Sequence, residues 1–181
     1  LHTQALVLEG GAVDTDGKGN LLTTRHCLRN PNRNPDLSEA ELCERLKAEL
    51  GVRDIWWLDH GELEGDDTDA HVDTLARFVD ARTLAYVQCR DSSDSHYPSL
   101  HAMEQELQTL ARQHNLTLVA LPLPTPQYSR EGERLPATYA NFLITNDKVL
   151  LPVYGCDTDQ EAITALQAVA GDRGVTPVNC R

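Results

Sequence analysis

The stretch Ser38–Gly51, with the sequence SEAELCERLKAELG, contains both the start and the end signal of a helix. Ser38 followed three residues later by Glu41 is the pattern of a capping box, in which each side chain bonds the other residue's backbone N–H. Leucines recur at every fourth position, and a glycine ends the run. The stretch therefore predicts an amphipathic helix with one leucine-rich face.

Two further segments have the same apolar periodicity, one from about Tyr97 to His114 and one starting near Asp159. The starts at residues 38, 97 and 159 lie 59 and 62 residues apart. Strand-like runs surround the three helices in a recurring order. They cover residues 5–8, 12–15, 21–24 and 54–58, then 75–78, 84–88 and 116–121, then 139–145, 148–153 and 174–178. This predicts an α/β fold of about three strand–strand–helix–strand units (about 1–60, 61–125 and 126–181), and such a period is typical of repeats that close into a ring.

Composition excludes several classes of protein. Hydrophobic residues make up 40% of the chain and charged residues 24%, as in soluble globular proteins. The net charge of −12 argues against a nucleic-acid binder, which needs clustered Lys and Arg. Neither a membrane-spanning run nor a signal peptide is recognisable, and we predict no membrane association.

The cysteines and the two ends of the chain give two more expectations. Five widely spaced cysteines without a CxxC pair indicate a reduced, cytoplasmic protein with neither a disulfide framework nor a metal site. The chain starts at Leu1, inside a strand-like run, and stops directly after another run. We therefore expect a fragment or a processed product.

Four acidic or histidine side chains are the candidates for chemistry. His71 precedes Asp73 by two residues, and residues two apart on an extended segment point to the same side. Glu9 ends an apolar run before two glycines, and Asp67 lies in the acidic run before the histidine. Carboxylates can hold a guanidinium through charge-assisted hydrogen bonds, and a histidine can act as general acid and base. Each feature alone is more often a solvated turn or a surface hydrogen bond.

The combination of motifs is more specific. The segments Leu8-Glu9-Gly10-Gly11, Leu21-Leu22-Thr23-Thr24, Asn30-Pro31-Asn32-Arg33-Asn34-Pro35 and Asp66-Asp67-Thr68-Asp69-Ala70-His71-Val72-Asp73 closely resemble the agmatine deiminase family, also called the Porphyromonas-type peptidylarginine deiminases. Leu121-Pro122-Leu123-Pro124, Tyr139-Ala140-Asn141-Phe142 and Pro152 extend the likeness along essentially the whole chain.

The resemblance implies a single domain, a five-bladed α/β propeller of the pentein class, of which residues 1–181 form part. It implies hydrolysis of agmatine to N-carbamoylputrescine and ammonia, a step of putrescine and polyamine biosynthesis, without a cofactor or metal. By motif, His71 is the acid–base histidine, Glu9 the glutamate of the Glu-Gly-Gly turn and Asp73 a guanidinium-binding carboxylate. We add Asp67 as a second substrate-binding carboxylate.

Two departures from the family pattern affect these expectations. Ala70 stands where the family usually has glycine, which is harmless unless that position needs a positive φ. The family's C-terminal Gly-rich His-Cys motif and its N-terminal Trp-x-Arg-Asp segment are absent from this chain, and Cys180 has no such context. We therefore expect the chain by itself to be inactive.

Two alternatives stay open at this stage. The first is a peptidylarginine deiminase, which would share the same guanidinium machinery. The second is a non-catalytic remnant that binds but does not react. In either case the expected partner is a small cationic guanidine or an arginine side chain, and the sequence leaves a homo-oligomer open.

Overall fold

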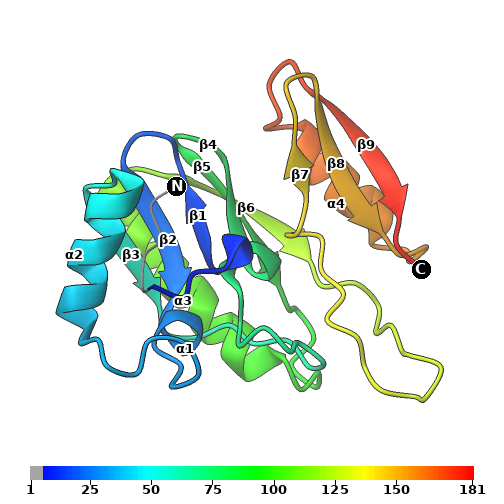
Figure 1. Cartoon of the computed structure of the whole chain (residues 1–181). Coiled ribbons are helices and arrows are strands. Elements are labelled where there is room, and N and C mark those ends of the chain that lie inside the picture. Colours follow the sequence, from blue (N-terminus) through cyan, green and yellow to red (C-terminus); the bar gives the residue numbers. More distant parts are fainter. Residues whose placement is uncertain (1–5) are drawn as a thin grey trace.

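Three three-stranded sheets follow one another along the chain in this computed structural model, which describes residues 6–181 (Figure 1). In each sheet the first two strands are antiparallel and the third pairs parallel with the second. A helix connects each parallel pair. The elements of the first sheet are β1 (Val13–Thr15), β2 (Asn20–Thr24), α2 (Glu39–Leu50) and β3 (Asp54–Leu58). Those of the second are β4 (Ala76–Asp80), β5 (Thr83–Gln88), α3 (Tyr97–His114) and β6 (Thr117–Pro122), and those of the third are β7 (Leu143–Ile144), β8 (Lys148–Val153), α4 (Asp159–Gln167) and β9 (Gly174–Asn179).

The helix signals at residues 38–51 have the predicted effect. Ser38 and Glu41 form both hydrogen bonds of the capping box, and Gly51 ends α2 with φ 68°. That left-handed conformation is available to glycine without a steric penalty. Leu46 is fully buried, whereas Leu50 is 44% exposed, so the buried leucine face is shorter than the periodicity predicted.

Helices α3 and α4 each pack where two sheets meet. A cluster around Met103 and Leu107 of α3 joins Trp56 and Leu58 of β3 to residues of β4 and β5. Helix α4 contributes Ala162 and Leu166 to a second cluster, which also contains Leu121 of β6. Helix α3 therefore packs against the first and second sheets, and α4 packs against the second and third (Figure 1).

Several predicted runs differ from the structure. Residues 6–8 form no strand, and residue 5 lies outside the described part of the chain. Only Leu143–Ile144 of the run 139–145 is extended, because Tyr139 and Phe142 turn inward as fully buried core side chains. The His-x-Asp pair, His71 and Asp73, does not lie on an extended segment. A short 3-10 helix, η2 (Val72–Thr74), begins directly after the histidine, so the two-residue argument gave the wrong local structure.

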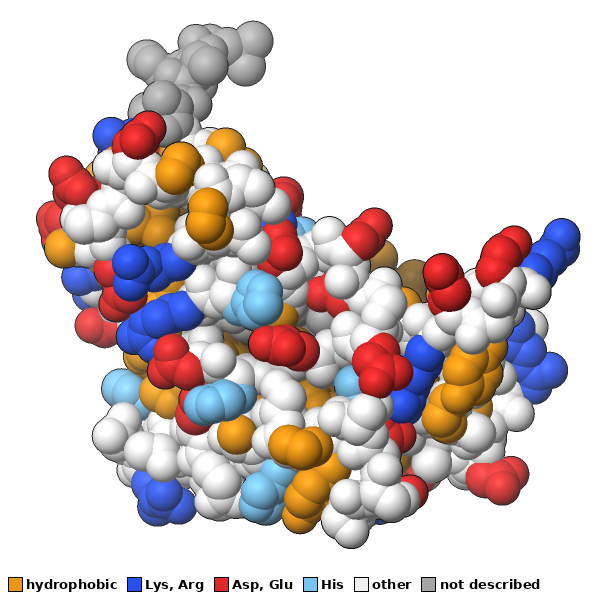
Figure 2. All heavy atoms as spheres, turned by 90° about the horizontal axis from the view of Figure 1, so that it is seen from below, with side chains coloured by type: hydrophobic (Ala, Val, Ile, Leu, Met, Phe, Trp, Pro, Cys, Tyr) orange, Lys and Arg blue, Asp and Glu red, His pale blue; other side chains and the backbone are white. Residues whose placement is uncertain are grey.

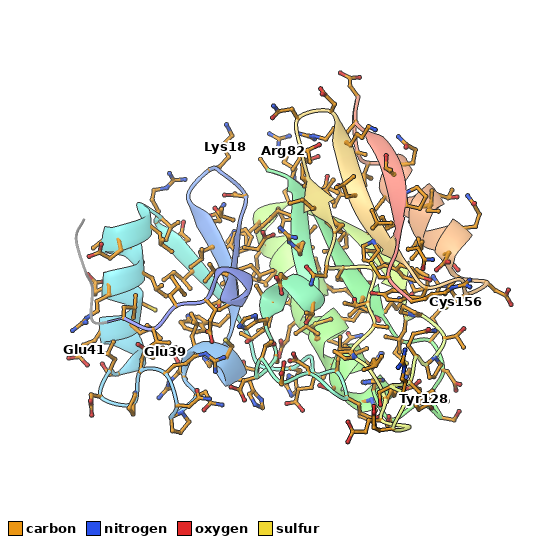
Figure 3. The ribbon with its side chains drawn as sticks, turned by 45° about the vertical axis from the view of Figure 1, so that its right-hand side comes forward. Lys18, Glu39, Glu41, Arg82, Tyr128 and Cys156 are labelled. Atoms are coloured by element: carbon orange, nitrogen blue, oxygen red, sulfur yellow. The ribbon has the colours of Figure 1, made fainter. Side chains whose placement is uncertain are left out.

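The α/β class predicted from the sequence is confirmed. The sheets are open within residues 6–181, and a closed ring of blades is not formed there. The hairpin turns that carry Lys18 and Arg82 lie at one end of the molecule, and Glu39 and Glu41 lie at the other (Figure 3). In the described part of the chain, no helix is both long and apolar enough to cross a membrane.

Candidate active site

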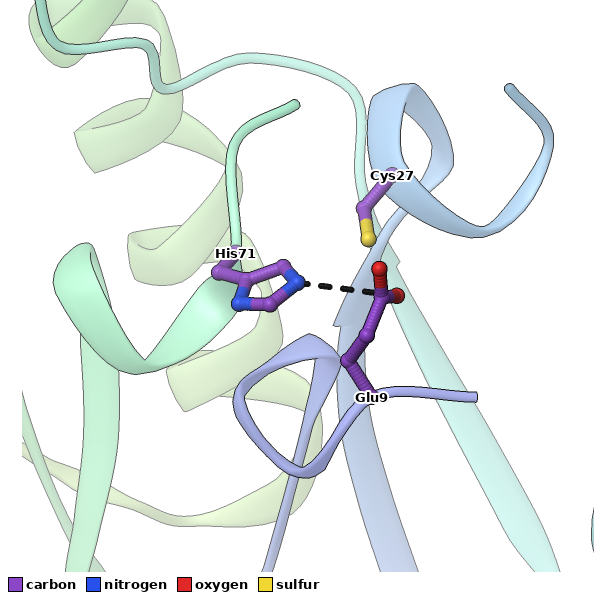
Figure 4. Close-up of side chains that lie close together, drawn as sticks. All are labelled: Glu9, Cys27 and His71. Atoms are coloured by element: carbon purple, nitrogen blue, oxygen red, sulfur yellow. Dashed lines mark ion pairs between the residues drawn. The ribbon is translucent and has the colours of Figure 1, made fainter. Parts of the chain in front are cut away.

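Glu9 and His71 meet between the first and second sheets (Figure 4). Glu9 directly precedes the short 3-10 helix η1 (Gly10–Ala12), and His71 directly precedes η2. The Glu9 Oε2 atom lies 3.6 Å from the His71 Nε2 atom. Two residues 62 positions apart in the chain are therefore brought together where η1 and η2 pack against each other.

Cys27 completes this group from a third segment. It belongs to α1 (Arg25–Leu28), which follows β2 directly. Its Sγ and the ligand atoms of Glu9 and His71 all lie within 4.8 Å of one another (Figure 4). The thiol is fully buried, and burial raises its pKa to about 11. It is therefore a neutral thiol at neutral pH and a poor nucleophile.

Arg33 holds Glu9 in place. Its Nε and Nη2 donate to the two carboxylate oxygens of Glu9 at 2.7 and 2.9 Å, which is the bidentate geometry that suits a guanidinium. Nη1 donates to Asp69 Oδ2 at 2.6 Å. Only 5% of the Arg33 side chain is exposed. These hydrogen bonds lower the pKa of both Glu9 and Asp69, which keeps the two carboxylates ionised.

The acidic turn before His71 is built by its own side chains. Asp66 Oδ1 accepts from the Thr68 backbone N–H, and Asp66 Oδ2 accepts from the Ala70 N–H at 2.8 Å. Asp69 and Ala70 both have left-handed φ values, 61° and 62°. The position where the family usually has glycine does need a positive φ, so alanine is strained there. Thr24 Oγ1 donates to the Ala70 carbonyl at 2.7 Å and ties this turn to the end of β2.

Asp73 and His71 both approach Gly11. A Cβ atom added at Gly11 would lie 2.6 Å from both Asp73 Oδ2 and His71 Nδ1, so the two side chains converge on one point above that glycine. Burial raises the pKa of the Asp73 carboxyl, and the neighbouring His71 opposes the shift. A cation that docked beside Asp73 would favour its ionised form.

The His71 Nε2 atom is buried and has no hydrogen-bond partner among the described residues. A buried polar atom left unpaired costs about 1–3 kcal/mol. Within residues 6–181, the carboxylate within ion-pair distance of it is that of Glu9, and 3.6 Å is too long for a hydrogen bond. The imidazole therefore keeps one nitrogen available for a bound group.

The structure thus brings together three of the four predicted site residues: Glu9, His71 and Asp73. Asp67 is exposed, and within residues 6–181 no hydrogen bond or ion pair joins it to them. The binding role of Asp67 stays a prediction. Sequence reasoning missed Arg33 and Asp69, although Arg33 lies inside a quoted motif, because a turn-rich loop gives no sign of where an arginine points. It also missed Cys27, which has no neighbouring motif.

Acidic, basic and histidine side chains are interspersed on the face seen from below (Figure 2). Over the whole sequence, acidic residues outnumber basic ones, with a net charge of −12. A net charge of this sign favours the approach of a cation over that of an anion.

Comparison with known proteins places this site in a family. The profile of the Porphyromonas-type peptidyl-arginine deiminases matches residues 1–181. A Vibrio parahaemolyticus protein named as an agmatine deiminase is 42% identical over 179 residues, which cover 89% of this chain and 49% of that protein. The chain belongs to the agmatine deiminase family, that is, the Porphyromonas-type peptidyl-arginine deiminases.

Solved structures agree with this assignment. A cysteine-to-serine variant of the C. jejuni agmatine deiminase with substrate bound has a TM-score of 0.91 and 40% identity, over 96% of this chain and 51% of that one. A Porphyromonas gingivalis structure named as an arginine deiminase has a TM-score of 0.94 and 51% identity, over 98% of this chain and 52% of that one. The chain spans about half the length of the relatives it matches.

Proposed function

We propose that the protein containing this chain hydrolyses the guanidinium group of agmatine to N-carbamoylputrescine and ammonia. The observation that supports it best is the convergence of Glu9, His71 and Asp73, because this set combines a proton-transfer group with carboxylates suited to a guanidinium. Membership of the agmatine deiminase family supports the same chemistry. We further propose that the three sheets are blades of a five-bladed pentein propeller in the whole protein.

Each side chain has a distinct part in this proposal. Asp73 holds the substrate cation, and the cation in turn keeps its carboxylate ionised. A thiolate attacks the guanidinium carbon, and His71 then gives a proton to the departing nitrogen, which leaves as ammonia. His71 next takes a proton from the water that attacks the thiouronium carbon, and the C–S bond breaks to release the product and the thiol. Glu9, fixed by Arg33, stabilises the imidazolium that His71 carries before the first transfer and forms again in the second.

The attacking thiolate is assigned to a cysteine outside these 181 residues. Cys27 is close enough to His71, but its thiol is buried beneath Glu9 and has a pKa of about 11. Thiolate reactivity requires a lowered pKa and access to the substrate. We therefore expect no ammonia release from agmatine by the 181-residue chain alone. Turnover at ordinary enzymatic rates would contradict this assignment.

The roles of the His-x-Asp pair are separated by two variants of the full-length protein. His71→Ala should lose about 10²–10⁴-fold in turnover and keep most of its affinity for agmatine. Asp73→Ala should weaken agmatine binding by about 1–3 kcal/mol, because a charge-assisted contact is lost. Calorimetric titration of agmatine in a nucleophile-inactivated background measures the second effect. Equal affinity of Asp73→Ala and the unmutated site would remove Asp73 from the binding role.

The unmutated full-length protein decides the substrate class. Ammonia release is measured with agmatine and with an arginine-containing peptide at equal concentration. Preference for agmatine is expected. A preference for the peptide would instead make the protein a peptidylarginine deiminase, and turnover of neither by the full-length protein would leave a non-catalytic binding module.

A further inference from the structure

The geometry points to a metal site that the sequence did not predict. We propose that Glu9, Cys27 and His71 together bind a divalent ion of the zinc class. These three residues come from three different segments, and their ligand atoms lie within 4.8 Å of one another. They offer one oxygen, one sulfur and one imidazole nitrogen, a mixture that suits Zn²⁺.

The distances are close to those of a tetrahedral site. Zinc ligands at about 2.0–2.3 Å from the ion stand about 3.3–3.8 Å from each other in a tetrahedron. Glu9 Oε2 and His71 Nε2 are already 3.6 Å apart, a separation that fits two ligands of one ion and exceeds that of a hydrogen bond. Cys27 Sγ lies within 4.8 Å of a carboxylate oxygen of Glu9 and of a ring nitrogen of His71, so it needs to move by about 1 Å, which a side-chain rotation can supply.

Each ligand atom has a coordination position available. His71 Nε2 is buried without a hydrogen-bond partner among the described residues, so an ion would satisfy an atom that is otherwise unpaired. Glu9 Oε2 accepts one hydrogen bond from Arg33, and a carboxylate oxygen has a second lone pair. The Cys27 thiol releases its proton when a metal binds, as metal-ligating cysteines do.

A carboxylate lies close to the other ring nitrogen of His71. A metal-bound histidine usually directs that nitrogen toward a carboxylate. Asp73 Oδ2 and His71 Nδ1 would each lie 2.6 Å from a Cβ atom added at Gly11, and no hydrogen bond or ion pair joins the two side chains among residues 6–181. A rotation of either side chain would pair them and fix the orientation of the ring.

Three protein ligands leave a fourth position for water or substrate. An ion at this place would occupy the nitrogen that carries the proton in the proposed hydrolysis, so it would inhibit that reaction. This consequence rests on the proposed function, whereas the binding itself does not.

Binding of Co²⁺ to the 181-residue chain tests the proposal without any enzymatic assay. Cobalt bound by a thiolate in a tetrahedral site gives an intense sulfur-to-metal absorption band in addition to its visible bands. We expect one equivalent of Co²⁺ to produce that band, and Zn²⁺ to abolish it by displacement. Absence of the band would overturn the proposal, whether or not the protein later proves to hydrolyse agmatine.

Variants identify the ligands. Cys27→Ser should lose the absorption band, and the matched control Cys180→Ser, which changes an exposed cysteine, should keep it. A band that persists in Cys27→Ser would assign the metal to another cysteine and overturn the proposal. His71→Ala, which removes one ligand and leaves both cysteines in place, should lose one-to-one Zn²⁺ binding. Unchanged Zn²⁺ affinity in that variant would contradict the site even if Cys27→Ser failed to fold.

Discussion

Replacing Arg33 by glutamine should destabilise the fold more than any comparable change of a surface arginine. Arg33 is 5% exposed and pairs with Glu9 and Asp69, whose side chains are 42% and 28% exposed. Breaking a fully buried ion pair costs about 3–5 kcal/mol, whereas an exposed pair contributes about 0–1 kcal/mol. The arginine is buried and its two partners are partly exposed. We therefore expect Arg33→Gln to lower the free energy of unfolding by about 2–3 kcal/mol, a value between these limits.

Arg25 supplies the matched control. It also binds two carboxylates, Glu39 at 3.0 Å and Asp59 at 2.6 Å, but its side chain is 34% exposed. Arg25→Gln should therefore cost at most about 1 kcal/mol. Urea unfolding of the chain and of both variants, followed by far-ultraviolet circular dichroism, gives the free energies of unfolding. If Arg33→Gln were no more destabilising than Arg25→Gln, burial of the Arg33 guanidinium would not explain how its ion pairs stabilise the fold.

The dependence on pH follows from the two carboxylates. Hydrogen bonds from Arg33 lower the pKa of Glu9 below 4.5 and that of Asp69 below 3.8. A carboxylate whose pKa is lowered by folding stabilises the folded state above its unfolded-state pKa, and this contribution disappears as the pH falls through the folded-state value. The difference in stability between the unmutated chain and Arg33→Gln should therefore be constant near neutral pH and shrink below about pH 4.

Two further predictions each compare the same substitution at two positions of one segment. Gly11→Ala should cost about 1–3 kcal/mol, because the new Cβ would lie 2.6 Å from both side chains of the His-x-Asp pair. Gly10→Ala, where a Cβ meets open space, should change the stability by less than about 0.5 kcal/mol. On helix α2, Leu46→Ala removes a fully buried side chain and should cost about 2–5 kcal/mol. Leu50→Ala, at a position 44% exposed, should cost well under half as much. Urea unfolding checks all four, and equal effects within either pair would contradict the packing described here.

Local sequence determined the elements whose signals lie within a few residues of one another. The capping box at Ser38 and the glycine at residue 51 set both ends of α2, because each acts on backbone groups of one helical turn. The apolar periodicity of residues 97–114 predicted α3 with the bounds that the structure has. The order of motifs also indicated the family, which the comparisons confirmed.

Only the tertiary structure decided how the site is assembled. The sequence marked Glu9, before a glycine turn, and His71, on an expected extended segment, as candidates, but their 3.6 Å approach depends on how the first two sheets pack. Arg33 and Cys27 were not predicted as site residues, since the direction of a side chain from a loop or a one-turn helix is set by distant contacts. The positive φ of Ala70 likewise depends on Asp66 and Thr24. Side-chain convergence between segments is a long-range property, and local residue patterns do not encode it.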